Sequence, residues 1–195
     1  MPTPSGQPSH RRGAAVDAVV LTTVCDLLGD RGYGFSIDDV AQQADVHKTT
    51  IYRKWATKPM LIAAAMDHLA QRTVDLDHSD DPIADLYELT RRVAAALRTE
   101  AGGNTLRAVI AAAADDPELA TVTQRFLARR YDTAIAIISA GPHTGRLRDD
   151  LDPHIVWTCI ANPLHMHTIL GDPADDAAAV TIVDHVLAGA LATAP

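Results

Sequence analysis

The sequence lacks the segments that membrane insertion or secretion requires. No apolar run approaches the roughly 18 residues of a membrane-spanning helix, and the run at 108–114 has only seven. The first twelve residues, MPTPSGQPSHRR, have no apolar core of the kind found in signal peptides. We therefore expect a cytoplasmic protein with no membrane partner.

Cysteine is scarce, since Cys25 and Cys159 are the only two residues of this type. So small a number excludes the dense disulfide framework of small secreted domains. Both cysteines fall within apolar stripes of helical spacing, so we predict two buried thiols in a reducing compartment. A disulfide between them is the alternative.

The sequence also lacks the motifs of common enzyme classes. It has no nucleophile elbow, glycine-rich phosphate loop or paired carboxylates, so we expect no enzymatic activity and no cofactor. Nine histidines are present, but His165 and His167 lie two residues apart and would face different sides of a helix. No cysteine or carboxylate follows them at helical spacing to complete a ligand set, so we predict no metal site.

Positive charge is in deficit overall, since the formal net charge is −8. Residues 1–60 nevertheless hold seven Lys and Arg against six Asp, whereas the remainder holds 10 basic and 19 acidic residues. The N-terminal third is therefore the part suited to contact nucleic acid. The balance argues against non-specific binding driven by charge alone.

Residues 36–58, SIDDVAQQADVHKTTIYRKWATK, carry the clearest functional pattern. A first short helix is predicted by apolar residues at helical spacing, namely Ile37, Val40, Ala41 and Ala44. Ser36 is suited to cap this helix, and a tight turn follows at 45–46. The pattern predicts two helices joined by a turn.

The second helix of this pair has the features of a DNA-recognition helix. Its apolar residues Val46, Ile51 and Trp55 are expected to point inward. Its outer face is basic and rich in hydroxyl groups: Lys48, Thr49, Thr50, Tyr52, Arg53 and Lys54. Such a helix packs on its partner and still reaches base edges and phosphates. We predict DNA contacts from Ser36, His47, Lys48, Thr49, Thr50, Tyr52, Arg53 and Lys58.

Two roles divide these candidates. Lys48 and Thr49 begin the second helix, where we expect them to read base edges in the major groove. Thr50, Tyr52 and Lys58 are expected to hold the phosphate backbone.

This segment resembles the TetR family of bacterial one-component regulators. The residues that match the family pattern in order and spacing are Val46, Lys48, Thr50, Ile51, Tyr52, Trp55 and Lys58. The sequence differs at Asp45 and Thr49, where the family usually has Gly, and at His47, where it usually has a capping Ser or Thr. We expect His47 to cap weakly, to touch phosphate or to lie on the surface. The resemblance extends to 32–35 and, more weakly, to 162–165.

Beyond residue 57 the sequence predicts helices only. Asp-Pro pairs mark helix starts, because Asp is a favoured N-cap and Pro at the first position loses no hydrogen bond. They occur at Asp81–Pro82, Asp116–Pro117, Asp152–Pro153 and Asp172–Pro173. We predict helices at 58–73, 82–99, 104–114, 117–139, 153–170 and 173–191, with breaks at 102–103 and 141–145.

With three helices before residue 57, the expected total is nine, which the TetR resemblance also implies. We predict an all-α protein with a disordered N-terminal arm at 1–12. A three-helix DNA-binding domain at 13–57 would contain the helix-turn-helix motif at 36–55. A helical effector-binding and dimerisation bundle would occupy 58–195.

The last two predicted helices, 153–170 and 173–191, are rich in apolar residues. A broad apolar face on the final helix comprises Ala179, Ile182, Val183, Val186, Leu187, Ala190 and Leu191. We predict a homodimer through these two helices, because small residues let a symmetry mate approach closely. The alternative is that this face packs on its own domain.

Pro163 interrupts a helical run and frees the carbonyl of Cys159 from its usual partner. It either kinks the helix without consequence or opens a cavity towards the helices at 58–73, 82–99 and 104–139. Our candidates for contact with a ligand there are Met66, Tyr87, Arg107, Trp157, Asn162 and His165. A mainly aliphatic lining suits a small hydrophobic effector.

The predicted function is sequence-specific regulation of transcription, by a repressor that a small hydrophobic ligand releases from operator DNA. The alternative is a helical ligand-binding module that has lost specific DNA binding. Asp38, Asp39 and Asp45 near the predicted DNA face keep that alternative open.

Overall fold

The computed structural model describes residues 8–71, 79–141 and 147–190. In these ranges the chain forms nine α-helices and one 3-10 helix, which confirms the all-α class. In chain order they are α1 (Pro8–Arg31), η1 (Gly32–Gly34), α2 (Ile37–Gln43), α3 (Lys48–Lys54), α4 (Lys58–Gln71), α5 (Pro82–Arg98), α6 (Glu100–Ala113), α7 (Pro117–Ala140), α8 (Pro153–Ile169) and α9 (Asp176–Ala190). None of these helices is long and apolar enough to cross a membrane.

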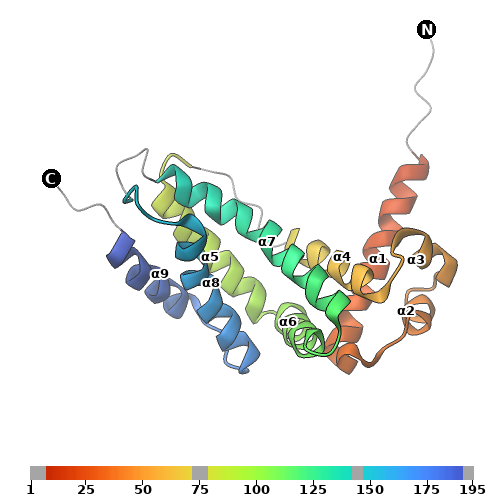
Figure 1. Cartoon of the computed structure of the whole chain (residues 1–195). Coiled ribbons are helices and arrows are strands. Elements are labelled where there is room, and N and C mark those ends of the chain that lie inside the picture. Colours follow the sequence, from red (N-terminus) through yellow and green to blue (C-terminus); the bar gives the residue numbers. More distant parts are fainter. Residues whose placement is uncertain (1–7, 72–78, 142–146, 191–195) are drawn as a thin grey trace, which may run out of the picture.

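The molecule is elongated, with α1, α2 and α3 gathered at one end and α9 at the other (Figure 1). The helices α4 and α7 connect the two ends, and α4 packs against both α1 and α7. The short helices at the first end therefore rest on a longer helical scaffold.

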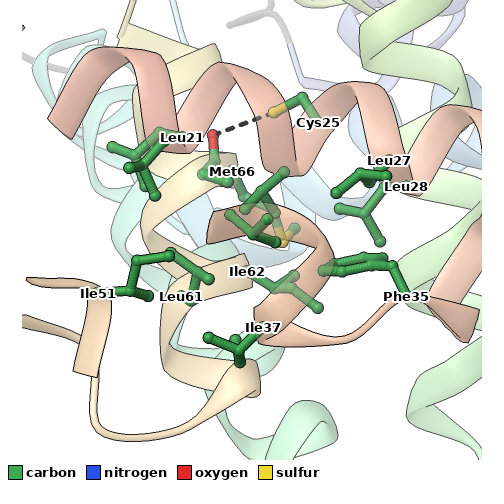
Figure 2. Close-up of a cluster of buried hydrophobic side chains, with 14 of the residues drawn as sticks. Leu21, Cys25, Leu27, Leu28, Phe35, Ile37, Ile51, Leu61, Ile62 and Met66 are labelled. Carbon is green, nitrogen blue, oxygen red and sulfur yellow. Dashed lines mark hydrogen bonds between the residues drawn. The ribbon is translucent and has the colours of Figure 1, made fainter. Parts of the chain in front are cut away.

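One apolar core joins α1 to α4 (Figure 2). Ile51 of α3 and Leu61 and Ile62 of α4 are completely buried in it. The same cluster continues into Val109 of α6 and Phe126 of α7. The helix-turn-helix region thus shares one apolar core with the second part of the chain.

The first helix begins earlier than the sequence indicated. We expected a disordered arm at 1–12, but α1 starts at Pro8, so the expected arm is too long. Proline fits the first position of a helix because its missing N–H has no partner there. Residues 1–7 of the expected arm lie outside the described residues.

Three of the four Asp-Pro pairs cap helices as predicted. Asp81, Asp116 and Asp152 each accept a hydrogen bond from a backbone N–H in the first turn of α5, α7 and α8, at 2.8–3.3 Å. The pair at 172–173 does not start a helix, because Asp175 takes the capping role instead. Its Oδ1 accepts from the N–H of Ala178 at 2.8 Å, and α9 starts at the next residue.

Gly102 and Gly103 lie inside α6, where we had predicted a break. Thr99 caps the helix by accepting a hydrogen bond from the N–H of Gly102 at 3.0 Å. A Cβ atom at Gly102 would lie 2.1 Å from the carbonyl oxygen of Ala96, and one at Gly103 would lie 2.9 Å from that of Leu97. The glycines therefore allow α6 to begin directly against the end of α5.

The apolar face of α9 packs on its own domain. Ala179, Val183, Leu187 and Ala190 are at most 3% exposed and contribute to cores shared with α5 and α8. The prediction that this face forms the dimer contact is therefore wrong for these residues, and Leu191 lies outside the described residues. A helix that closes a bundle must use its apolar stripe within the bundle.

The two cysteines differ in environment. Cys25 is buried and its Sγ donates to the carbonyl oxygen of Ala65 at 3.7 Å, whereas Cys159 is exposed on α8. Burial raises the pKa of Cys25 to about 11. The prediction of a buried thiol is confirmed for Cys25 and wrong for Cys159, and both are free thiols.

Candidate functional site

A capping box fixes the start of α2. The Oγ of Ser36 accepts a hydrogen bond from the N–H of Asp39 at 3.2 Å, and the N–H of Ser36 donates to Oδ2 of Asp39 at 2.7 Å. Hydrogen bonds from Ser36 are also the main cause of the lowered pKa of Asp39. The predicted cap is confirmed.

The turn between α2 and α3 depends on a left-handed residue. Asp45 has φ of 50°, a conformation that Asp adopts more readily than most residues other than Gly. The N–H of Val46 then donates to the carbonyl oxygen of Ala41 at 3.0 Å. Asp45 thus performs the backbone role for which glycine is usual in the sequence pattern.

His47 caps α3. Its Nδ1 accepts from the N–H of Thr49 at 3.4 Å and lies 2.9 Å from Oγ1 of the same threonine. Acceptance at Nδ1 requires an unprotonated Nδ1. The cap that was one of the expected roles of His47 is confirmed, and the hydroxyl of Thr49 lies beside the ring of His47.

The exposed and buried sides of α3 follow the predicted division. Ile51 is completely buried, and Val46 and Trp55 are half-buried against the core. The residues of the outer face that are exposed are Lys48, Thr49, Tyr52, Arg53 and Lys54, and Thr50 is half-buried. The helix therefore presents a cationic, hydroxyl-bearing surface to solvent.

Two of the lysines on this surface have carboxylate partners. Nζ of Lys48 lies 3.2 Å from Oδ1 of Asp38 in α2, and the ammonium of Lys54 binds the carboxylate of Asp17 in α1. Arg53 has no ion pair within the described part of the chain. Arg53 is therefore the least restrained cation on this face, and Asp38 offsets part of the charge of Lys48.

Lys58 is bound inside the fold. Its Nζ donates to the carbonyl oxygens of Tyr33 at 2.5 Å and Phe35 at 2.6 Å, and lies over both rings at 3.8 and 4.3 Å. Burial lowers its pKa, with opposing attraction from Asp116 and Asp39. The predicted phosphate contact is not supported by this position, because the ammonium connects α4 to η1.

Two further hydrogen bonds connect this region to α7. The hydroxyl of Tyr33 donates to Oδ2 of Asp116 at 2.5 Å, and the hydroxyl of Thr57 donates to Oε1 of Glu118 at 2.6 Å. Burial raises the pKa of Tyr33, and the hydrogen bond from Tyr33 lowers that of Asp116. We call these bonds, together with those of Lys58, the interdomain contacts. Sequence analysis recognised Asp116 only as a helix cap.

A cavity of about 130 Å³ lies among α4, α5, α6, α7 and α8. We call it the central cavity. Its lining is mainly aliphatic and aromatic, with a few polar groups: Met66, Leu69, Ala70, Leu89, Val93, Ala96, Leu97, Thr99, Gly102, Thr105, Leu106, Phe126, Leu127, Arg130, Tyr131, Trp157, Ala161 and His165. It lies among the helices to which sequence analysis assigned it.

Comparison with known proteins decides the family. The family description "Bacterial regulatory proteins, tetR family" matches residues 20–65, and "Tetracyclin repressor-like, C-terminal domain" matches residues 77–186. The chain belongs to the TetR family. It is therefore a DNA-binding transcriptional regulator with a helix-turn-helix, and its family is regulatory rather than enzymatic.

Relatives of the TetR family match along nearly the whole chain. The "DNA-binding transcriptional repressor TetR" of Mycobacteroides abscessus is 32% identical over 185 residues, which cover 90% of this chain and 94% of that protein. The crystal structure of the TetR family transcription regulator SCO0332 is 26% identical, has a TM-score of 0.72 and covers 92% of this chain and 99% of that chain. A TetR transcriptional regulator from Agrobacterium tumefaciens has the same fold, with 23% identity, a TM-score of 0.73 and coverage of 91% and 95%.

Three of the six predicted ligand residues line the central cavity of this TetR protein: Met66, Trp157 and His165. The other three do not. The hydroxyl of Tyr87 donates to Asp184 of α9, and Nη1 of Arg107 donates to the carbonyl oxygen of Thr168 at 3.0 Å. Asn162 is exposed on the outer side of α8.

Four lining residues of α7 were missed by the sequence analysis: Phe126, Leu127, Arg130 and Tyr131. The spacing of 126 and 130 is one helical turn, so they share a face. The hydrophobic pattern of α7 alone gave no sign that part of this face meets a cavity rather than a neighbouring helix. Among the described residues no group of three His, Cys, Asp or Glu is placed to hold a metal ion.

Proposed function

We propose that this protein is a repressor that dissociates from operator DNA when a small hydrophobic ligand binds in the central cavity. The observation that carries the proposal is the position of α4. Leu61 and Ile62 of this helix lie in the core beneath the helix-turn-helix, and Met66, one turn further, lines the cavity. A ligand that moves α4 would therefore move the support of α3.

In the proposed complex α3 enters the major groove. Lys48 reads a base edge after leaving Asp38, and Thr49 contacts a thymine methyl group. Arg53, Tyr52 and Thr50 hold the backbone on either side. Ser36 and His47 contribute by fixing the ends of α2 and α3 through their caps.

The working unit is proposed to be a homodimer, because two recognition helices must reach successive major grooves about 34 Å apart. We place the contact on the outer face of α8 and the small exposed residues of α9. Ile155, Met166 and Leu170 are 59%, 54% and 76% exposed. Ala177 and Ala188 of α9 are also exposed and would allow close approach of the partner.

Release requires that the ligand bind two arrangements of the protein with different affinities. The interdomain contacts of Tyr33, Thr57 and Lys58 support one of these arrangements. Tyr33 and Thr57 bind carboxylates at the start of α7, and Lys58 joins α4 to the carbonyl oxygens of Tyr33 and Phe35. A coupling free energy of about 1–3 kcal/mol would weaken operator binding by roughly 5- to 150-fold. The proposed site of action is the bacterial cytoplasm, where a DNA-binding regulator meets its operator.

The proposal is tested by operator binding. Duplexes from the promoter region beside the gene, screened for an inverted repeat, would be titrated with the dimer by fluorescence anisotropy. Binding at least a thousandfold tighter to the repeat than to a scrambled duplex supports a specific regulator, in line with typical specificity ratios of about 10³–10⁷. Equal affinity for both duplexes would instead favour a ligand-binding module without specific DNA recognition.

A further inference from the structure

Trp157, a lining residue of the central cavity, carries a buried donor without a partner among the described residues. Its side chain lines the cavity, the residue is 3% exposed, and Nε1 is buried with no hydrogen-bond partner among the described residues. An indole N–H can only donate. Buried donors in native proteins are nearly always paired with protein, water or ligand. The position of Trp157 therefore favours an occupant that carries an acceptor atom.

Arg130 adds a second donor-only group. It is the one charged residue among the described residues of the lining. Its Nη2 donates to the carbonyl oxygen of Ala70 at 3.3 Å, which uses one of five guanidinium N–H groups. Burial lowers the pKa of Arg130, and attraction to Asp67 opposes this effect.

The carboxylate of Asp67, which attracts Arg130, is already bound to another arginine. Oδ2 of Asp67 accepts from Nη2 of Arg129 at 2.7 Å. His165, which also lines the cavity, has its pKa lowered by burial below the ordinary 6.5, so it is neutral at pH 7. Arg130 is thus a partly desolvated cation that an anion in the cavity would complement.

The size and walls of the cavity indicate one aromatic ring. A volume of about 130 Å³ is close to the roughly 150 Å³ of an engineered protein cavity that binds benzene. Phe126, Tyr131 and Trp157 supply aromatic walls, and the rings of Tyr131 and Trp157 meet edge-on with centroids 6.3 Å apart. Aromatic rings favour such edge and offset contacts with one another.

We propose that the ligand of the central cavity is a single-ring aromatic carboxylate. Its ring packs among Phe126, Tyr131 and Trp157, and its carboxylate accepts hydrogen bonds from Arg130 and from Nε1 of Trp157. An ionised carboxylate only accepts, and so matches two groups that only donate. This inference rests on the proposed function in one respect, that the central cavity is the effector site.

Isothermal titration calorimetry on the full-length protein tests the inference without DNA. Sodium benzoate is compared with benzamide, which keeps the ring and a carbonyl acceptor but has no charge, and with ethylbenzene. We expect benzoate to bind about tenfold more tightly than either. Arg130→Met should abolish the preference over benzamide, and Arg130→Lys should keep part of it because the charge remains.

Two further variants separate charge from hydrogen bonding. Trp157→Phe should weaken benzoate and benzamide alike, because both lose the same donor. Arg125→Met, which removes an exposed arginine of α7 that does not line the cavity, should change nothing.

The inference is overturned if benzoate fails to bind, if benzamide or ethylbenzene binds as tightly, or if Arg130→Met keeps the preference. Its failure can be distinguished from failure of the proposed function. If ethylbenzene releases the protein from DNA and benzoate binds no more tightly than ethylbenzene, the carboxylate ligand is contradicted and release by a ligand is supported. Selective benzoate binding that leaves DNA affinity unchanged would support the carboxylate and contradict release.

Discussion

Substitutions at Leu187 and Leu170 compare a leucine in the core of the protomer with a leucine on the proposed dimer surface. Leu187 is 3% exposed in the core shared with α5 and α8, whereas Leu170 is 76% exposed beyond the end of α8. Truncation of a buried leucine to alanine removes apolar contacts and leaves a cavity, at a cost of about 2–5 kcal/mol. In a chain of this length each kcal/mol lowers Tm by roughly 2–4 °C. We therefore expect Leu187→Ala to lower Tm by about 4–20 °C.

The same truncation at Leu170 should leave the protomer intact and act on assembly. Melting curves by circular dichroism at equal micromolar concentrations compare Leu187→Ala, Leu170→Ala and the wild type. Sedimentation velocity of Leu170→Asp, which puts a charge in the proposed contact, should then show folded monomers. Equal losses of Tm in the two alanine variants, or a Leu170→Asp protein that stays dimeric, would refute this division of the surface.

Three other substitutions test the proposed roles of Lys48, Lys58 and Tyr33. Lys48→Ala should cost about 1–3 kcal/mol on operator DNA and relax preference at one base pair, and equal loss on random DNA would show a phosphate contact only. Lys58→Ala should lower Tm but leave the salt dependence of DNA binding unchanged, because the ammonium is bound to Tyr33 and Phe35. A slope of log affinity against log salt concentration that falls by about one would contradict this. Tyr33→Phe should lower Tm at pH 7, because it removes the hydrogen bond to the ionised carboxylate of Asp116. The Tm difference between wild type and variant should shrink as pH falls below 3.8 through the depressed pKa of Asp116. A constant Tm difference down to pH 3 would show that this hydrogen bond does not cause it.

The signals that predicted structure correctly are local ones. Ser36 and Asp116 each cap a helix through an N–H three residues further along the chain, so neighbouring positions of the sequence are enough to predict the cap. The inward and outward sides of α3 follow from helical spacing, and Ile51 is buried as that spacing requires. The resemblance to the TetR family then indicated that the outer side of α3 contacts DNA.

The features that sequence analysis missed depend on contacts between distant segments. Lys58 has the spacing of a phosphate contact, but its ammonium meets carbonyl groups 23 and 25 residues earlier in the chain. Gly102 looks like a helix break, yet its missing Cβ is what lets two helices meet. The apolar face of α9 was predicted to contact a partner protomer, with packing on its own domain as the alternative. The structure shows that Leu187 is buried within the domain.

We propose that occupation of the central cavity controls DNA binding. The decisive measurement is the affinity for the inverted repeat by fluorescence anisotropy at fixed salt. It is made with and without the tightest cavity ligand found by thermal shift. The wild type and Trp157→Phe are compared. We expect a saturating ligand to weaken operator binding by roughly 5- to 150-fold in the wild type, and to need a higher concentration in the variant. A ligand that saturates the cavity of the wild type and leaves operator affinity unchanged would contradict control of DNA binding by the cavity.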